Sequence, residues 1–289
     1  MEWHNISDPA SPELDRLAER YRLHPLHIED CRHRNQSAKI EEGQSYLFTV
    51  MKVIRFDPQG ELEIADLDIF LGQDYIITVI ETDCPETEGL IARAQKATDQ
   101  SDRADQKYYR LIDEIVDSYL PITDKLSETL DHLEDEALAD PTPQTLSTIF
   151  ETKRTLILLR RVMVNTRDVA THLQRTESAF IARDMWPFLR DVYDHVARNL
   201  DTVEVLRDLL NGSLDVYLSS VANRTNQVMK VLTVLGTIAL PTLAVSGIYG
   251  MNVKGLPGAE SPYGLAAVFA IIVGTTAFLL WILKRFGWF

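Results

Sequence analysis

The chain has 289 residues with 43 acidic and 29 basic side chains, so its formal net charge is −14 with histidine neutral. A chain this acidic argues against nucleic acid as a partner, because phosphates would be repelled, and it favours cations. A charge that serves only solubility is the alternative. Cys31 and Cys84 lie far apart without CxxC spacing, so they predict neither a disulfide framework nor a zinc knuckle and are expected to be buried small residues. No basic segment followed by an apolar one opens the chain, so we expect no secretory signal.

Residues 1–105 are predicted to form an α/β domain. Two stretches rich in valine, isoleucine, phenylalanine and tyrosine predict strands, and turns that contain proline or glycine punctuate them. Two short helical patterns lie upstream. The predicted strands cover residues 45–57 and 62–81, with a turn at 72–74 inside the second stretch, and the short helices cover 13–21 and 26–31.

From residue 106 to residue 230 the pattern is helical. Residues 106–138 predict one long amphipathic helix, bent near Pro121 and stopped by two later prolines. A second helix is expected at 144–173, and a third begins near Ala182.

The third helix carries apolar residues at steps of three and four, which is close to the heptad seam of a coiled coil. No proline interrupts the pattern before a long apolar segment, so we expect one stalk helix that continues into the membrane. Such a helix is too long for its own chain's small domain to hold, so we expect the seam to face other copies of the chain. The seam consists of Leu189, Tyr193, Val196, Leu200, Val203, Leu206, Leu210, Leu214, Tyr217 and Val221.

Two segments, residues 231–251 and 264–283, contain no Asp, Glu, Lys, Arg or His. Each is about 20 residues long, and at about 1.5 Å per residue this length matches a hydrocarbon core of about 30 Å. We therefore predict a two-span membrane region at residues 231–289.

The flanking charges predict the orientation of the two spans. Arg224 and Lys230 precede the first span, and Lys284 and Arg285 follow the second, whereas the loop between them holds Lys254 offset by Glu260. The positive-inside rule then places both termini in the cytoplasm. We expect the protein in the plasma membrane, which is the inner membrane of a two-membrane cell.

Residues 223–252 read NRTNQVMKVLTVLGTIALPTLAVSGIYGMN, and a Gly-Met-Asn sequence thus closes the first of two C-terminal spans. In this respect the chain resembles the CorA family of divalent-metal transporters. Further matching stretches extend the resemblance over nearly the whole chain: residues 24–31, 39–42, 46–53, 117–121 and 190–195. The resemblance implies an α+β membrane protein assembled as a funnel-shaped homopentamer, with the first spans around one central pore.

The resemblance implies that Gly250, Met251 and Asn252 form the selectivity filter at the outer mouth. An amide oxygen can accept hydrogen bonds from water around an ion without a full negative charge, which suits sites that must bind a cation and release it. Magnesium gives up its water reluctantly, so recognition of the hydrated ion is physically sensible. Gly250 lets the chain turn out of the helix, and Met251 is expected to pack. A plain helix C-cap and turn is the structural alternative.

The resemblance also implies a pore face at helical spacing, with a polar ring at its inner end and an apolar gate that closes by dewetting. Packing between helices is the alternative role for the gate residues. The family commonly has Pro-Leu-Thr where this chain has Pro241-Thr242-Leu243, which puts a polar ring in the middle of the pore in doubt. The pore face consists of Asn226, Met229, Leu232, Gly236, Leu240 and Leu243, of which Asn226 is the polar ring and Met229 and Leu232 are the gate.

Regulation by cytoplasmic Mg²⁺ is a further implication of the resemblance. Asp191 matches one half of a regulatory site between subunits, and the other half is expected in the N-terminal domain, where Asp83, Glu86 and Glu88 are candidates. A solvated helix or loop face is the alternative role for each of these acids. The sequence contains no GxxxxGK[ST] motif, so the membrane potential is the expected driving force, at about 2.3 kcal/mol per charge and 100 mV.

The function expected from the sequence is channel-like influx of Mg²⁺, with Co²⁺ or Ni²⁺ as further substrates. A zinc transporter of the same fold, coupled to protons, and a membrane-anchored metal sensor that conducts nothing are the alternatives. The cluster of His24, His27 and His33 lacks a nucleophile, a base and zinc-site spacing, so we expect no enzyme and assign these residues to packing.

Overall fold

The computed structural model describes residues 1–33, 36–80, 84–99, 102–175, 177–252, 255–258 and 261–287. The chain divides into two compact units, Met1–Val216 and Tyr217–Phe289. This division is coarser than the three regions expected from the sequence, and their boundaries stay a prediction.

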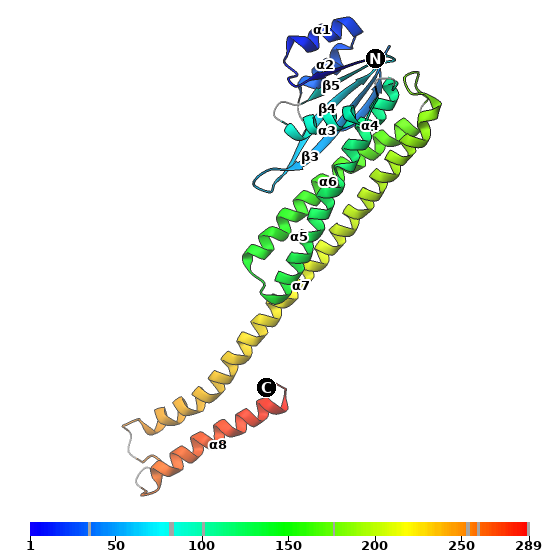
Figure 1. The fold of residues 1–289 in the computed structure, drawn as a ribbon. Helices are drawn as coiled ribbons and strands as arrows, with labels where there is room; N and C mark the ends of the chain where they lie inside the picture. Colours follow the sequence, from blue (N-terminus) through cyan, green and yellow to red (C-terminus); the bar gives the residue numbers. More distant parts are fainter. Residues whose placement is uncertain are drawn as a thin grey trace. The chain divides into compact units, whose positions relative to one another are not determined.

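A five-stranded sheet in the order β1-β5-β4-β3-β2 forms the centre of the first unit (Figure 1). β1 pairs with β5 in parallel and all other neighbours are antiparallel. The expected strands are confirmed, and the second stretch forms two strands around the predicted turn. The two edge strands were missed because they are short and polar, as sheet edges commonly are. The strands are β1 (Glu2–Ile6), β2 (Lys39–Glu42), β3 (Leu47–Phe56), β4 (Leu62–Leu71) and β5 (Tyr75–Ile80).

Helices cover both faces of the sheet. On one face, α1 (Pro12–Tyr21) and α2 (Pro25–Arg32) bury apolar side chains against Phe48 and Val50 of β3. Neighbouring residues of a strand point to opposite faces, so Thr49 faces the other side, where its hydroxyl lies 2.6 Å from the Tyr108 hydroxyl of α4 (Ala104–Asp117). α3 (Pro85–Lys96), which the sequence patterns did not predict, packs against α4 and β3.

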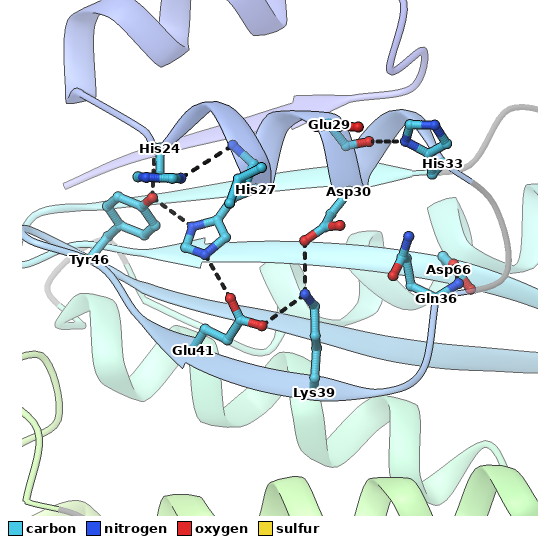
Figure 2. A network of polar contacts seen from close by, with 11 residues as sticks. His24, His27, Glu29, Asp30, His33, Gln36, Lys39, Glu41, Tyr46 and Asp66 are labelled. Atoms are coloured by element: carbon cyan, nitrogen blue, oxygen red, sulfur yellow. Dashed lines mark hydrogen bonds and ion pairs between the residues drawn. The ribbon is translucent and has the colours of Figure 1, made fainter.

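The three clustered histidines serve α2 and its contact with the sheet, as expected (Figure 2). His24 caps the helix, since its Nδ1 accepts from the Leu26 N–H, and His33 stands at the other end. His27 is buried, stacks on Phe48 with ring centroids 4.5 Å apart, and lies between the Tyr46 hydroxyl at 2.7 Å and a Glu41 oxygen at 2.9 Å. A carboxylate only accepts, so Nε2–H of His27 donates to Glu41 and Nδ1 accepts from Tyr46.

The long helix expected at residues 106–138 is wrong in one respect. The structure has two helices there, α4 and α5 (Leu120–Ala139), with a break at Ser118 and Tyr119. Pro121 has no N–H to donate and is tolerated in the first turn of a helix, so it starts α5 instead of bending a continuous helix.

α6 (Pro143–Arg175) returns along α5, and α7 (Trp186–Tyr249) follows after a short 3₁₀ turn (Arg183–Met185). The expectation that the heptad seam of α7 faces other copies is wrong for most of its length. Between Leu189 and Tyr217 the seam residues are buried or half-buried within a single chain. α4 and α6 of the same chain contact this part of α7, and the pattern of α7 alone does not reveal them. Beyond Tyr217 the helix is exposed in the single chain, including Val221. The buried seam residues are Leu189, Val196, Val203, Leu206, Leu210 and Tyr217.

The second unit contains the two apolar segments, as the end of α7 and as α8 (Gly264–Arg285). Both helices are long and apolar enough to cross a membrane, and none of the most apolar stretch of either is buried inside the chain. Neither is therefore a core helix of a soluble protein, and neither lies near the N-terminus as a signal sequence would.

Candidate functional site

The Gly-Met-Asn sequence lies at the point where α7 ends. The Gly250 N–H donates to the Ser246 carbonyl at 2.8 Å, and a Cβ atom built on Gly250 would lie only 2.8 Å from that same oxygen. A side chain at this position would therefore push the last turn apart, which explains the glycine without any function. Asn252 follows two residues later and is exposed.

The loop after Asn252 is tied back to the helix end. The Tyr249 hydroxyl donates to the Pro257 carbonyl at 3.0 Å. Gly255 and Gly258 have φ values of +92° and +78°, which other residues rarely adopt, so the loop is built on positions that need glycine. Lys254 and Glu260 lie outside the described residues.

The expected pore residues share one face of α7. Asn226, Met229 and Leu232 are exposed in the single chain, and so are Leu240 and Leu243. Their exposure does not single out this face, because Val231 and Leu235 on other faces are exposed to the same degree. Hydroxyl groups of this helix bond to backbone carbonyls one turn earlier, Thr233 to Met229 and Thr237 to Thr233 among them, so they are satisfied without a partner helix.

A cluster of metal-ligating side chains lies where α4 packs beside α7. Asp113 comes from α4, and Asp191 and His195 come from α7, and one ligand atom from each lies within 4.8 Å of the others. His195 Nδ1 is 3.9 Å from an Asp113 oxygen, and His195 Nε2 is 3.8 Å from an Asp191 oxygen. The Asp113 Oδ1 and His195 Nδ1 atoms are buried and have no hydrogen-bond partner.

Comparisons with known proteins decide the family. The family described as CorA-like Mg²⁺ transporter protein matches residues 1–285. The cobalt/magnesium transport protein CorA of Thermotoga maritima is 34% identical over 99% of this chain and 83% of its own length. This chain belongs to the CorA-like Mg²⁺ transporter family.

Two further relatives agree with this assignment. The complete structure of the CorA magnesium transporter from Methanocaldococcus jannaschii matches with a TM-score of 0.85 at 25% identity, over 99% of this chain and 91% of that one. The divalent cation transporter CmaX of Pseudomonas aeruginosa is 23% identical over 86% of this chain and 75% of its own length. This CorA-like chain is therefore a metal-ion transporter and not an enzyme.

The cluster has the donor set and electrostatics of a cation site. Two carboxylates and an imidazole suit divalent ions from magnesium to cobalt, nickel and zinc. Burial raises the pKa of Asp113, and repulsion from the nearby Asp117 raises it further, so a bound cation would stabilise the ionised carboxylate there. Ligand atoms at about 2.1 Å from one ion lie no more than about 4.2 Å apart; the cluster needs only a small contraction or a bridging water.

Of the expected regulatory-site residues that the structure describes, only Asp191 is brought into the cluster. Asp191 joins the cluster, whereas Glu86 lies in the first turn of α3 and pairs with Arg55 at 2.6 Å. Glu88 is exposed in the same turn, where a carboxylate favours the positive end of the helix dipole. Asp83 lies outside the described residues. Within one chain, then, the partners of Asp191 come from α4 and from its own helix.

Sequence reasoning missed Asp113 and His195 as members of this site. Both belong to motifs with an i, i+4 spacing of metal-ligating residues, Asp113 with Asp117 and Asp191 with His195. Each pair lies on one helix face, and that spacing was the available signal. Nothing in the sequence says that the two faces meet.

Proposed function

We propose that this CorA-like protein is a channel-type importer of hydrated Mg²⁺, with Co²⁺ and Ni²⁺ as further substrates, that is driven by the membrane potential. One observation carries the proposal: the apolar C-terminal part of α7 is not buried within the chain, the helix ends at Tyr249, and an exposed Asn252 follows as the last residue of Gly-Met-Asn. This is where a conducting assembly would need a cation-recognising group. The family assignment supports the transport of metal ions.

Asn252 would act through its side-chain oxygen. Several copies around one axis would form a ring of neutral acceptors for the water shell of the ion, together with Gly250 and Met251 as the filter. A neutral ring holds a divalent ion weakly enough for release, whereas a ring of carboxylates would trap it. Outer-shell recognition also avoids the cost of stripping water from magnesium.

The gate would lie deeper along α7, at Met229 and Leu232. A narrow ring of methionine and leucine side chains excludes water and so blocks ions without a plug. Asn226 would offer a polar ring on the cytoplasmic side of this constriction. Gly236, Leu240 and Leu243 would line the remaining path.

Cytoplasmic Mg²⁺ would close the channel at the Asp113, Asp191 and His195 cluster. A cation bound there joins α4 to α7, the helix that continues to the proposed gate. Loss of the ion would leave Asp113, Asp117 and Asp191 to repel one another, which loosens α7. Carboxylates from the N-terminal domain of a neighbour, such as Glu86, Glu88 or Asp83, would complete the shell if subunits meet here.

This function requires several copies, because one copy of α7 cannot enclose a path. We propose a homopentamer in the plasma membrane with both termini in the cytoplasm, in line with Arg224 and Lys230 before the first span and Lys284 and Arg285 after the second.

Flux into liposomes tests the proposal. The full-length protein should carry Mg²⁺ and Co²⁺ down a potential with no dependence on a pH gradient, and Asn252→Ala should lower the rate about tenfold or more. Thr242→Ala, one of the exposed polar positions off the pore face, is the matched control and should leave flux unchanged. Zinc flux that requires a pH gradient would favour the zinc transporter, and metal binding without any flux would favour the sensor.

A further inference from the structure

The exposed face of α5 carries a stripe of carboxylates. Asp124, Glu128, Asp131 and Asp135 follow one another at steps of four, three and four, which places them on one side of the helix, and all four are exposed. In the described part of the chain none of them has an ion pair or a side-chain hydrogen bond. Exposed leucines flank the stripe at both ends, Leu120 at 52% and Leu138 at 69% exposure, so it is bordered by apolar surface.

The exposed face of α6 carries a complementary stripe with the same spacing. Phe150, Arg154, Ile157 and Arg161 also follow at steps of four, three and four. Phe150 and Ile157 are 53% and 50% exposed, so two large apolar side chains alternate with the two arginines along this stripe. Neither arginine has an ion pair among the described residues. A basic and apolar stripe in a chain of net charge −14 calls for an acidic partner.

The two stripes lie at the same height in the helical hairpin. Buried positions of α5 and α6 occur in pairs that are equally many residues before and after residue 141 in the turn. Two residues equally many positions from residue 141 therefore lie at the same level along the hairpin. By this rule Glu128 is level with Arg154, and Asp124 lies between the levels of Arg154 and Arg161. The buried positions that establish it are Ala137 with Thr145, Leu133 with Ile149, Leu130 with Thr152, and Leu126 with Leu156.

The stripes cannot meet within one chain, because each points away from the buried face of its own helix. The neighbouring Arg160 illustrates the contrast, since it turns toward α7 and pairs with Glu204 there. A hollow of about 400 Å³ between α6 and α7, lined by Ile157, Arg161 and Val203 among others, adjoins the basic stripe and leaves room for incoming side chains.

We infer that the α5 stripe of one copy docks on the α6 stripe of the next copy. This rests on the proposed function, which needs several copies around one axis. The two faces of this contact differ, so the interface is head-to-tail. Copies related by rotation about an axis parallel to the helices can then form a closed ring, in which every copy uses both of its stripes. Because the two stripes lie at the same level along the hairpin, neighbouring copies can dock without a shift along the axis. The contact is distinct from the metal cluster, so it holds neighbours together whether or not that cluster is loaded.

Cross-linking of the full-length protein in liposomes tests the inference. Glu128→Cys and Arg154→Cys are combined in a background in which the buried Cys31 and Cys84 are replaced by alanine and serine, and a short bis-maleimide is added. A head-to-tail ring gives a ladder of covalent species up to the complete assembly. The matched control replaces Arg154→Cys by Gln144→Cys, an exposed position of α6 that lies near the turn and far from the level of Glu128, and should give little ladder.

Charge reversal supplies a second readout. Glu128→Lys or Arg154→Glu alone should raise the apparent dissociation constant of the detergent-solubilised oligomer about threefold to tenfold, and the two together should restore it. An intact, conducting oligomer with no ladder and no response to reversal overturns the inference and leaves the proposed function standing. A ladder that stops at dimers overturns the head-to-tail ring. A monomer in the bilayer overturns the proposed function itself.

Discussion

His195 of α7 holds its Nδ1 atom 3.2 Å from a carboxylate oxygen of Asp117 on α4, yet that nitrogen has no hydrogen bond. Asp113, one turn before Asp117, also has a buried oxygen without a partner. A polar atom left unpaired in a buried place carries a cost of about 1–3 kcal/mol, and a cation between the two helices would remove it from both. Substitutions of Asp113 and His195 are therefore the most direct tests of which ion the cluster binds.

Asp113→Asn should weaken closure by cytoplasmic Mg²⁺. The substitution keeps the shape but removes one negative charge, so the internal Mg²⁺ concentration that halves the flux should rise about tenfold. Flux into liposomes with set internal Mg²⁺ measures it. Asp194→Asn, an exposed acid of α7 outside the cluster, should leave the half-blocking concentration unchanged; an equal effect of both variants would indicate general surface charge instead of a site.

His195→Gln should separate magnesium from the transition metals. Imidazole nitrogen favours Co²⁺ and Ni²⁺, whereas Mg²⁺ prefers oxygen ligands. The half-blocking concentration of Co²⁺ should therefore rise about tenfold or more, while that of Mg²⁺ should change by less than about threefold. Isothermal titration with each ion provides an independent measure, and a parallel loss for both ions would show that His195 only supports the fold.

Polar substitution at the gate should open it. Leu232→Ser lets water enter the proposed constriction, so flux should persist at an internal Mg²⁺ concentration that closes the wild type. Val231→Ser is the matched control, since Val231 is equally exposed in the chain but lies on another face of α7. Closure retained in Leu232→Ser, with loss of closure in Val231→Ser, would move the pore to a different face of the helix.

Tyr46→Phe should destabilise the first unit. The Tyr46 hydroxyl accepts from the His24 N–H at 2.8 Å and donates to the buried His27, so its loss removes both hydrogen bonds and leaves the His27 nitrogen unsatisfied in a buried place. We expect the unfolding free energy to fall by about 1–3 kcal/mol, measured by thermal or denaturant unfolding of the full-length protein. The exposed Tyr263 offers the control Tyr263→Phe, which should leave it unchanged.

Local patterns predicted what depends on local chemistry. Alternating and continuous apolar residues identified β3, β4 and β5, and the absence of charge over about 20 residues identified the ends of α7 and α8. A resemblance of motifs, not physics, led to Asp191. The short edge strands β1 and β2 escaped because their residues are polar and gain their stability from pairing with the rest of the sheet.

What the sequence could not predict depends on which elements meet. Leu189 and Val196 repeat as in a coiled coil, and the repeat is the same whether the partner helix belongs to the same chain or to another. Asp113 and His195 are 82 positions apart, and only the packing of α4 beside α7 unites them. The charged residues of α5 and α6 can be read from the sequence. That the two stripes lie at the same level follows only from the turn and the buried positions of the hairpin, which the structure shows.

Asp68 should make the stability of the first unit depend on pH. It lies at the centre of the sheet, is 4% exposed, and has an oxygen without a hydrogen-bond partner. Burial raises its pKa to about 7, and repulsion from Asp66 contributes. An unfolded aspartate ionises near pH 4. Between about pH 4 and 7 the unfolded state has therefore lost a proton that the folded state keeps, so a rise in pH favours unfolding, by up to about 1.4 kcal/mol per pH unit.

Asp68→Asn removes this titration while keeping the shape of the side chain. The thermal midpoint of the variant, relative to that of the wild type, should rise steadily from pH 5 to pH 7 and level off near pH 8, where the folded wild type is also ionised. Scans of the full-length protein in detergent at fixed ionic strength measure it, and all other titrating groups cancel in the difference. Two midpoint curves that stay parallel from pH 5 to pH 8 would contradict the assignment, because they would show that Asp68 keeps one protonation state in both the folded and the unfolded chain.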